Sequence, residues 1–297
     1  MKNSDNIIVK LNGRLANQMF EWAFAKVLSK KSGNTVLIDD SEETLKLNCF
    51  NLISDLKSVE KPLFYKIFRK LIPFRNMRNK LTALNFDKME IVEEESFCRF
   101  EQKLLEISQP SYIKGFFQSE KYFKDIRGDL LKDFSLKIEL NEQNKNILNN
   151  IKSTNSVSMH FRRGDYTKKR VADKYGSCSV EYYKNAVKTI AEKFSEPVTL
   201  FIFSDDINWV KNSVKFDCET VYVDINSGKQ GYFDLELMKN CKHNIIANSS
   251  FSWWGAWLNE NKDKIVVAPK YWMKDIDTTS ENVDIIPEGW IISDNRE

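Results

Sequence analysis

The stretch Ser156–Asp165, SVSMHFRRGD, predicts a buried strand that ends in a cluster of cationic and titratable side chains. Successive side chains of a strand point to opposite faces, so Met159 and Phe161 share one face while His160 and Arg162 share the other. The apolar face is expected to pack into a core. The polar face leaves His160 and Arg162 side by side where the strand ends.

Outward from this stretch, the second half of the chain alternates short apolar runs with amphipathic ones. We expect strands at Ser156–Phe161, Val198–Phe203, Thr220–Val223, Asn244–Ala247 and Ile265–Ala268, and helices at Val180–Phe194, Ile207–Val214, Asp234–Asn240 and Ser252–Asn259. Short buried strands that alternate with helices indicate parallel βαβ units and an α/β fold. Ligands of such sheets bind beyond the carboxyl ends of the strands.

The first half begins in the same way and is separated from the second by a polar stretch. We expect strands at Ile7–Leu11, Thr35–Ile38 and Tyr112–Phe117, a helix after the first strand with one apolar face, and a helix at Glu120–Phe134. The stretch Ile138–Asn150 is rich in Asn and Glu, which favours a domain boundary there. The sequence therefore predicts two domains, residues 1–140 and 141–297.

Composition narrows the functional classes. Apolar residues make up 42% of the 297 residues, as in a globular protein, and a net charge of +3 gives no support for a nucleic-acid partner. The five cysteines are scattered and form no C-x-x-C pair, so we expect no disulfide framework, no zinc cluster and a reducing cytoplasmic location. The sequence has neither a secretory signal nor an apolar run of the ~18 residues that span a membrane, which predicts a soluble or at most peripheral protein.

A basic amphipathic segment, Lys61–Lys80, carries seven basic residues and no acidic ones, and Pro73 interrupts it. Two interpretations remain open. The segment is either the solvated face of a helical excursion, or a surface that is attracted to an anionic membrane or a lipid-linked substrate at the inner membrane face.

The turn after the first quoted strand predicts a phosphate site. Arg162 and Arg163 offer planar guanidinium groups that donate paired hydrogen bonds to phosphate oxygens, and Gly164 lets the backbone turn closely around them. The alternative is an ion-pair cluster in which Asp165 pairs with Arg163.

The stretch Ile245–Trp257, IIANSSFSWWGAW, predicts a second anion contact. Asn248, Ser249 and Ser250 crowd the start of a helix, where free backbone N–H groups attract anions. One of these side chains is expected simply to cap the helix. The three tryptophans that follow have the helical spacing of core residues.

Asp205 and Asp206 follow an apolar strand and Ser204, and three roles are open for them. They can cap the next helix, accept the paired N–H groups of a guanine edge, or hold a divalent cation that bridges phosphates. The nearby arginine pair already supplies positive charge, which argues against the metal.

Gly13, Asn17 and Gln18 lie between the first strand and its helix. Gly13 suggests a tight turn near a ligand, although neither a dinucleotide-binding glycine motif nor a Walker motif is present. Asn17 and Gln18 could equally bind sugar hydroxyls or cap the helix.

Taken together, these motifs resemble those of the bacterial α-1,2-fucosyltransferases of glycosyltransferase family 11. The resemblance runs from about Ile7 to Trp272 and rests on the stretches Gly13–Phe20, Gly115–Gln118, His160–Tyr166 and Ile246–Trp254. It implies a GT-B-like fold, in which two Rossmann-like domains face each other across a cleft. The implied reaction is metal-independent, needs no cofactor, and moves L-fucose from GDP-β-L-fucose to the 2-hydroxyl of a terminal galactoside with inversion.

The resemblance also implies roles for the two domains and for single residues. Residues 141–297 would bind the GDP-sugar, through His160, Arg162 and Arg163, and residues 1–140 would lie on the acceptor side. Asp205 and Asp206 would contact guanine. The acceptor would be a galactose-terminated oligosaccharide or lipid-linked glycan, and the setting would be surface polysaccharide assembly.

The implied reaction also suggests catalytic residues and leaves two alternative functions open. Arg162 would stabilise the departing diphosphate, and Asp165 is the first candidate for the general base, with Glu21 and His160 behind it. Ala16 stands where the family commonly has Gly, so a positive φ there would be strained. The rivals are another GDP-sugar transferase, such as a protein O-fucosyltransferase, and a binding module without catalysis.

Overall fold

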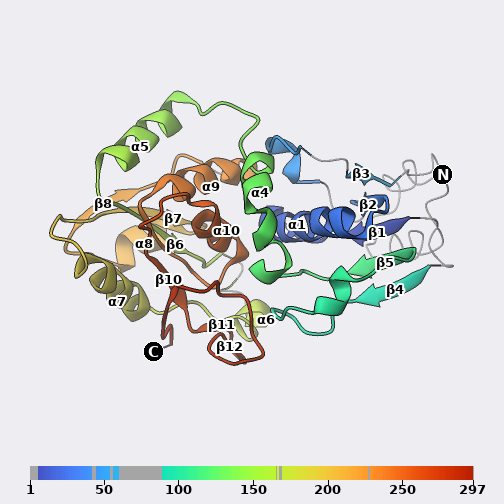
Figure 1. Cartoon of the computed structure of the whole chain (residues 1–297). Coiled ribbons are helices and arrows are strands. Elements are labelled where there is room, and N and C mark those ends of the chain that lie inside the picture. Colours follow the sequence, from blue (N-terminus) through green and yellow to red (C-terminus); the bar gives the residue numbers. More distant parts are fainter. Residues whose placement is uncertain are drawn as a thin grey trace. The chain divides into compact units, whose positions relative to one another are not determined.

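The computed structural model describes residues 6–41, 45–53, 56–59, 89–164, 166, 169–226 and 228–296, without the side chains of residues 169, 170 and 229. The chain divides into two compact units, Met1–Lys137 and Ile138–Glu297 (Figure 1). The sequence placed the boundary between residues 140 and 141. The basic segment Lys61–Lys80 lies outside the described residues.

The described part of the first unit contains a five-stranded parallel sheet. Its strands are β1 (Ile7–Lys10), β2 (Val36–Asp39), β3 (Lys57–Ser58), β4 (Glu90–Glu93) and β5 (Ser111–Lys114), in the spatial order β3-β2-β1-β5-β4. Every neighbouring pair is parallel. The strand order reverses between β1 and β5, and the loops that follow these two strands therefore lie at the switch point where open α/β sheets bind ligands.

Helix α1 (Leu15–Ser32) follows β1 and is buried on nearly all sides through its first three turns. The apolar residues of the helix are buried, and burial extends beyond the predicted face, since Gln18 and Glu21 are buried as completely. The helix ends at Gly33, which adopts a left-handed φ of 67° that favours glycine.

The predicted helix Glu120–Phe134 is broken into three pieces. The structure has 3₁₀ turns at Glu120–Tyr122 and Lys124–Ile126, and helix α4 begins only at Arg127 and ends at Asp133. Phe123 separates the two turns with a φ of −142° and is buried among aromatic side chains. Its burial outweighs the helical pattern of the sequence.

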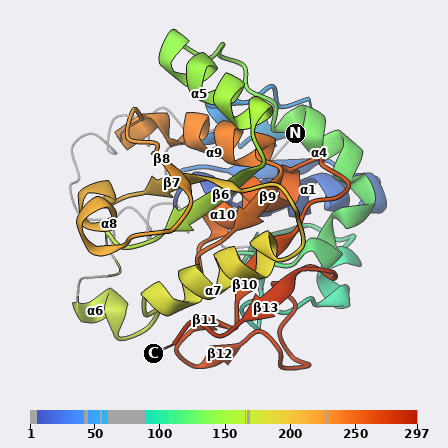
Figure 2. The same ribbon diagram turned by 90° about the vertical axis from the view of Figure 1, so that its left-hand side faces the viewer.

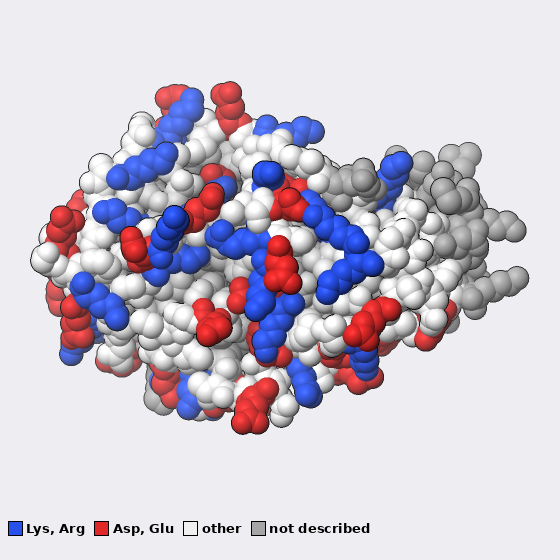
Figure 3. All heavy atoms as spheres, viewed as in Figure 1, with Lys and Arg blue, Asp and Glu red and all other residues white. Residues whose placement is uncertain are grey.

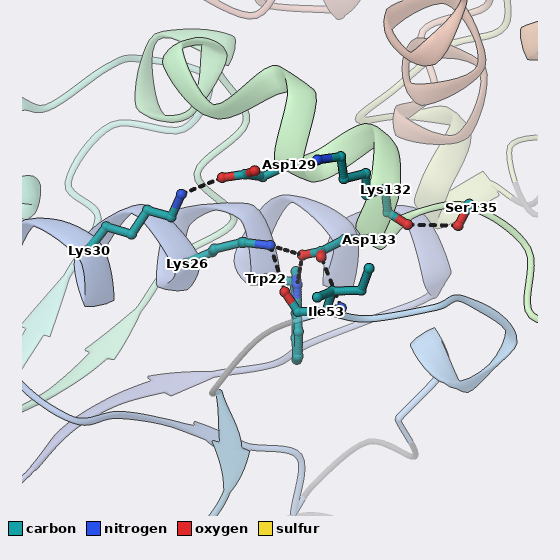
Figure 4. A network of polar contacts seen from close by, with 8 residues as sticks. All are labelled: Trp22, Lys26, Lys30, Ile53, Asp129, Lys132, Asp133 and Ser135. Atoms are coloured by element: carbon teal, nitrogen blue, oxygen red, sulfur yellow. Dashed lines mark hydrogen bonds and ion pairs between the residues drawn. The ribbon is translucent and has the colours of Figure 1, made fainter.

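A buried polar network ties α4 to α1 (Figure 4). The Lys26 Nζ lies 2.6 Å from the Asp133 Oδ2, and both side chains are almost fully buried. Asp133 also accepts hydrogen bonds from the Trp22 Nε1 at 3.1 Å and the Ile53 backbone N–H at 3.0 Å. The carboxylate charge is therefore compensated on both oxygens, as a buried charge requires.

The second unit contains a six-stranded parallel sheet among its described residues. Its strands are β6 (Ser156–Phe161), β7 (Thr199–Ser204), β8 (Glu219–Tyr222), β9 (His243–Ile245), β10 (Val266–Pro269) and β13 (Ile291–Ser293), in the order β13-β10-β9-β6-β7-β8. Its helices are α5 (Glu142–Ser153), α6 (Lys169–Ala172), α7 (Val180–Ala191), α8 (Ile207–Ser213), α9 (Gly231–Asn240) and α10 (Ser250–Leu258). The α/β prediction is confirmed in both units, each of which has Rossmann-like organisation.

Helices cover both faces of this sheet, as Figure 2 shows for α7 and α9. Met159 and Phe161 of β6 pack on the side of α7, as the strand alternation predicted. Phe201 and Phe203 of β7 pack on the other side with α5 and α9. His160 lies on this second side, where its ring approaches Phe251.

The polar stretch that suggested a linker is mostly helix. Asn141 caps α5 by accepting a hydrogen bond from the Asn144 N–H at 2.9 Å, and Ile151 is fully buried against α9. Few apolar positions suffice to dock this helix, which lies just after the division between the two units at Lys137 and Ile138.

The sequence did not predict several short strands. Edge strands β4 and β13 were not predicted, nor was the small antiparallel pair of β11 (Tyr271–Met273) and β12 (Ile276–Asp277). None of the helices in the described ranges is long and apolar enough to cross a membrane. Figure 3 shows basic and acidic side chains intermixed on the face in view.

Candidate functional site

Three polar motifs of the second unit meet at one edge of its sheet. Strand order reverses between β6 and β9, and these strands are direct neighbours, with Met159 opposite Ile245. On its other side β6 pairs with β7, with Phe161 opposite Ser204. Because all three strands run parallel, the residues after Phe161, Ser204 and Ile245 emerge together at the switch point.

Asp205 holds the loop that follows β6. Its Oδ1 accepts hydrogen bonds from the backbone N–H groups of Arg163, at 2.8 Å, and Gly164, at 3.0 Å. Its Oδ2 lies 2.7 Å from the Arg162 Nη1. A Cβ on Gly164 would come within 2.6 Å of the same Oδ2, so any larger residue would displace the Asp205 carboxylate or the loop. Asp205 therefore fixes both the backbone and the arginine of the predicted phosphate site.

Asp206 has a different role from its neighbour. It caps α8 by accepting a hydrogen bond from the Trp209 N–H at 3.4 Å, as the capping interpretation predicted. Its Oδ2 lies 3.6 Å from the Arg163 Nε. The Arg163 guanidinium stacks on the Trp209 ring, 3.3 Å from its centroid, which adds a cation–π contact.

His160 is buried beside the arginine pair. Burial lowers its pKa from 6.5 to about 4, with an opposing effect of Asp205 and a further lowering by Arg162, so the imidazole is neutral at neutral pH. Its backbone carbonyl accepts a hydrogen bond from the Tyr183 hydroxyl. Its Nδ1 has no hydrogen-bond partner among the described residues, which leaves a buried polar atom next to Arg162 for a ligand to satisfy.

The start of α10 lies at the same edge. Ser249 precedes the helix and makes no side-chain capping bond, while its carbonyl accepts the Trp253 N–H at 3.1 Å. The first backbone N–H groups of this helix of 9 residues are therefore not satisfied by the cap residue. Trp253, Trp254 and Trp257 are buried in the core, as predicted.

The Asn248 side chain bonds to protein groups, and its predicted contact with a diphosphate stays a prediction. Its Nδ2 lies within hydrogen-bond distance of the carbonyls of Tyr175, Gly176 and Trp272. Its Oδ1 accepts a weak bond from the Cys178 thiol at 3.7 Å. Asn248 therefore anchors the loop before α7, and a direct ligand contact would require breaking these bonds.

Sequence reasoning missed Tyr166 as a link between two motifs. The Tyr166 hydroxyl donates to the Asn248 carbonyl at 3.1 Å, and its ring lies 5.3 Å from the Arg162 guanidinium carbon and stacks on Tyr175. A tyrosine two residues after Gly164 was part of the quoted motif, but its partners lie far away in the chain. Trp209 was missed for the same reason.

Asp165, the predicted base, lies outside the described residues. The described residues contain no group of three His, Cys, Asp or Glu side chains that could hold a metal ion. All five cysteines fall in the described ranges and are free thiols.

The predicted residues of the first unit gather at its own switch point, after β1 and β5. Gly13 has a left-handed φ of 72°, and a Cβ there would lie 2.9 Å from the Asn17 Nδ2. The Gln118 Nε2 donates to the Asn17 Oδ1 at 3.1 Å, which joins two motifs of the sequence. Ala16 is helical, so the expected strain at this position is absent.

Gln18 is held by hydrogen bonds within the first unit, and the sugar contact that the sequence left open for it stays a prediction. It is fully buried, its Oε1 accepts the Lys46 N–H at 2.8 Å, and its Nε2 donates to the Gly13 carbonyl at 3.3 Å. These bonds leave Asn17 and Gln118 as the polar side chains best placed for a ligand on this edge.

Comparisons with known proteins agree with the motifs. The sequence model described as Glycosyl transferase family 11 matches residues 1–293. An Escherichia coli protein named O-antigen biosynthesis glycosyltransferase WbnK is 31% identical, over 88% of this chain and 93% of its own length. An E. coli alpha-1,2-colitosyltransferase is also 31% identical, over 96% and 98%. A mouse galactoside 2-alpha-L-fucosyltransferase, Sec1, is 26% identical over 84% of this chain and 63% of its own length.

Proposed function

Because this chain belongs to glycosyl transferase family 11, we propose that it transfers L-fucose from GDP-β-L-fucose to the 2-hydroxyl of a terminal galactoside, with inversion at the anomeric carbon. One observation carries this proposal. Arg162 and Arg163 are held by Asp205 and Trp209 at a sheet switch point, beside the start of α10.

The arginine pair would stabilise the leaving GDP. Negative charge grows on the diphosphate as the glycosidic bond breaks, and fixed cationic donors stabilise that charge without reorganising. Arg162 is held by Asp205, and Arg163 by the Trp209 ring, so both guanidinium groups are oriented before the donor binds. Ser249, Ser250 and the first N–H groups of α10 would contact the same anion.

His160 would act as a neutral hydrogen-bonding group in this site. Its lowered pKa keeps the imidazole uncharged at the pH of the cell, so it would orient the nucleotide without adding charge. Asp206 is more exposed than Asp205, at 39% against 27% of the side chain, and is the better candidate for the guanine edge. Asp165 remains our candidate for the base that takes the acceptor proton.

Metal independence is part of the proposal. The two arginines supply the positive charge that a divalent cation would otherwise bring to the diphosphate. We therefore expect full activity in EDTA, and an absolute requirement for a divalent cation would contradict this mechanism.

The donor sugar has one specific competitor. A relative that matches almost the full length of both chains is named as a colitosyltransferase, so GDP-colitose is the alternative donor. The acceptor would be a galactose-terminated oligosaccharide or lipid-linked glycan on the cytoplasmic side of the membrane. The basic segment Lys61–Lys80 would then bind anionic vesicles.

Product analysis tests the function. The protein is incubated with GDP-fucose or GDP-colitose and a panel of β-galactosides, with and without EDTA, and the product linkage and anomeric configuration are determined by NMR. An α-1,2-linked fucoside is expected. Transfer to protein hydroxyls alone would favour an O-fucosyltransferase, and GDP binding without transfer or donor hydrolysis would favour a binding module.

A further inference from the structure

Two buried or partly buried carboxyl groups of the first unit have no part in the mechanism above. Glu21 on α1 is fully buried, and its Oε2 accepts the Asn12 backbone N–H at 2.7 Å, just after β1. Glu94 directly follows β4 and accepts backbone N–H groups of the loop after β5. Both carboxyl groups therefore hold the loops that leave the sheet at its switch point.

Glu94 makes an unusual set of bonds with the loop Gly115–Gln118. Its Oε2 accepts the Phe116 N–H at 2.7 Å, and its two oxygens lie 3.2 and 3.3 Å from the Phe117 nitrogen. A Cβ on Gly115 would come within 2.7 Å of the Glu94 Cβ. The absence of a side chain at Gly115 is thus what lets the carboxylate reach the loop.

The same loop contains a residue in a sparsely populated backbone conformation. Phe117 has a φ of 51°, a left-handed conformation that a bulky side chain rarely adopts. Its ring is fully buried and stacks on Phe24 of α1, with centroids 3.9 Å apart. The hydrogen bonds that the loop donates to Glu94 and this stacking together hold the strained residue in place.

The loop delivers Gln118 to the polar edge of the unit. The Gln118 side chain is nearly fully buried and bonds to Asn17, but its Oε1 has no hydrogen-bond partner among the described residues. The Glu21 Oε1 likewise has none within the part of the chain that the structure describes. Buried polar atoms are rarely left unsatisfied, so a ligand hydroxyl or an ordered water is expected there.

We propose that Glu94 is a positioning residue that holds Gly115–Gln118 in the form that binds the acceptor sugar, and that it does so when ionised. This inference rests on the proposed function. Glu94 does not touch the reacting atoms. It acts through the backbone of the loop that presents Gln118 beside Asn17.

Several charged groups around Glu94 set the pH at which it is ionised. Burial raises its pKa from 4.5 to about 7, the N–H groups of Phe116 and Phe117 lower it, and the charge of Glu101 raises it. Glu101 in turn lies 3.5 Å from the Lys103 Nζ. Because the Phe116 and Phe117 N–H groups lower this pKa, the ionised carboxylate binds the loop more tightly than the protonated one as long as Glu94 itself stays buried. Global unfolding, which exposes Glu94, is instead favoured by the same ionisation as the pH rises through about 7.

The other titratable neighbours of Glu94 either have a pKa that burial raises or pair at the surface. Burial raises the pKa of Glu21 well above 4.5, with a contribution from the Glu94 charge and an opposing one from Lys10. Burial also raises the pKa of the Cys98 thiol. Glu93, the adjacent residue of β4, instead pairs with Lys114 at the surface, 2.9 Å away.

Acceptor kinetics of Glu94→Gln test the proposal. In this variant the side-chain amide would place its own N–H donors against the backbone N–H donors of Phe116 and Phe117. Because the loop would then be held less well, we expect the acceptor KM to rise about tenfold, equivalent to roughly 1.4 kcal/mol. Hydrolysis of GDP-fucose without acceptor should stay within about twofold. The wild-type acceptor KM should fall between pH 6 and pH 8, and the variant should lose this dependence. Glu94→Asp, which keeps the charge, should retain it.

Two controls separate this role from stability and from a failure of the proposed function. Glu93→Gln, which removes the adjacent surface carboxylate of β4, should keep the pH dependence of the acceptor KM. Hydrogen exchange of the Phe116 and Phe117 amides, corrected for intrinsic rates, should slow in the wild-type protein as the pH rises through 7, whatever sugar is transferred. The proposal would be overturned if the exchange of these amides did not slow, or if the acceptor KM of Glu94→Gln were unchanged. It would also be overturned if Glu94→Gln lost donor hydrolysis and transfer to the same extent. A wild-type protein that neither transfers nor hydrolyses GDP-fucose contradicts the proposed function instead.

Discussion

At the scale of single residues, the two consecutive carboxylates after β7 have different roles although they are neighbours in the chain. Asp205 bonds to the Arg162 guanidinium and to the loop before Gly164, whereas Asp206 caps a helix. The sequence identified both as site residues but assigned them the same guanine contact. It could not separate them because the loop partners of Asp205 lie about forty residues away, and pairing of that kind depends on strand register.

Arg162→Ala tests the charge stabilisation directly. Removal of one preorganised donor from a transition-state site commonly lowers the rate ~100- to 1,000-fold. We expect at least this loss in the transfer rate, with an unchanged melting temperature. The measurement is a steady-state assay beside thermal unfolding, and near-normal turnover would exclude Arg162 from the mechanism.

Gly164→Ala tests the clamp of Asp205 without changing any charge. The new methyl group would lie 2.6 Å from a carboxylate oxygen, so the loop and Arg162 must shift. We expect roughly tenfold weaker GDP binding, about 1.4 kcal/mol, by titration calorimetry. Gly128→Ala on α4 is the matched control, since a Cβ there meets nothing within 4 Å. Equal GDP affinity in both variants would contradict the clamp.

At the scale of elements, the sequence predicted those whose pattern repeats over a full strand or helix. The strand Ser156–Phe161 matches β6 because its alternation spans six buried residues. Strand β4 was missed because most of it is exposed at a sheet edge, and its pairing with β5 comes from the backbone. The helix expected at Glu120–Phe134 failed because Phe123 is buried in a non-helical conformation.

Asp133→Asn tests how α4 is attached to α1. The change leaves the Lys26 ammonium buried without its counter-charge, and breaking a buried pair in this way costs ~3–5 kcal/mol. Denaturant unfolding should show this loss, while GDP affinity at the folded protein should be unchanged. The control is Asp129→Asn, also on α4, which breaks an exposed ion pair with Lys30 of α1. This change should cost less than ~1 kcal/mol. Similar losses in the two variants would mean that the buried network adds nothing specific.

At the scale of the whole molecule, buried carboxyl groups and buried histidines have opposite effects on how folding stability depends on pH. Burial raises the pKa of Glu94 and of Asp234 to about 7 and raises that of Glu21. The folded state therefore binds more protons than the unfolded state above pH 4.5, and stability falls as the pH rises through 7. His160 and His243, with pKa values lowered to about 4, have the opposite effect below pH 6.5.

The free energy of unfolding should consequently be larger at pH 6.5 than at pH 8, by on the order of 1 kcal/mol. As the pH falls from 8 to 6.5, the buried carboxyl groups of the folded protein take up protons, and this gain exceeds the loss that comes from protonation of the two histidines in the unfolded state. Urea unfolding at the two pH values measures the difference, with Glu93→Gln as a surface control. Glu94→Gln should reduce this difference in the free energy of unfolding. A protein that is more stable at pH 8 than at pH 6.5 would contradict the raised pKa values of the buried carboxyl groups.

The central claim is that the guanidinium groups after β6 bind the diphosphate of the donor, and a crystal structure with GDP bound tests it most directly. We predict diphosphate oxygens within hydrogen-bond distance of Arg162, Arg163 and the first backbone N–H groups of α10. GDP bound at another edge of the molecule, with these arginines still paired only to Asp205 and Asp206, would contradict the account.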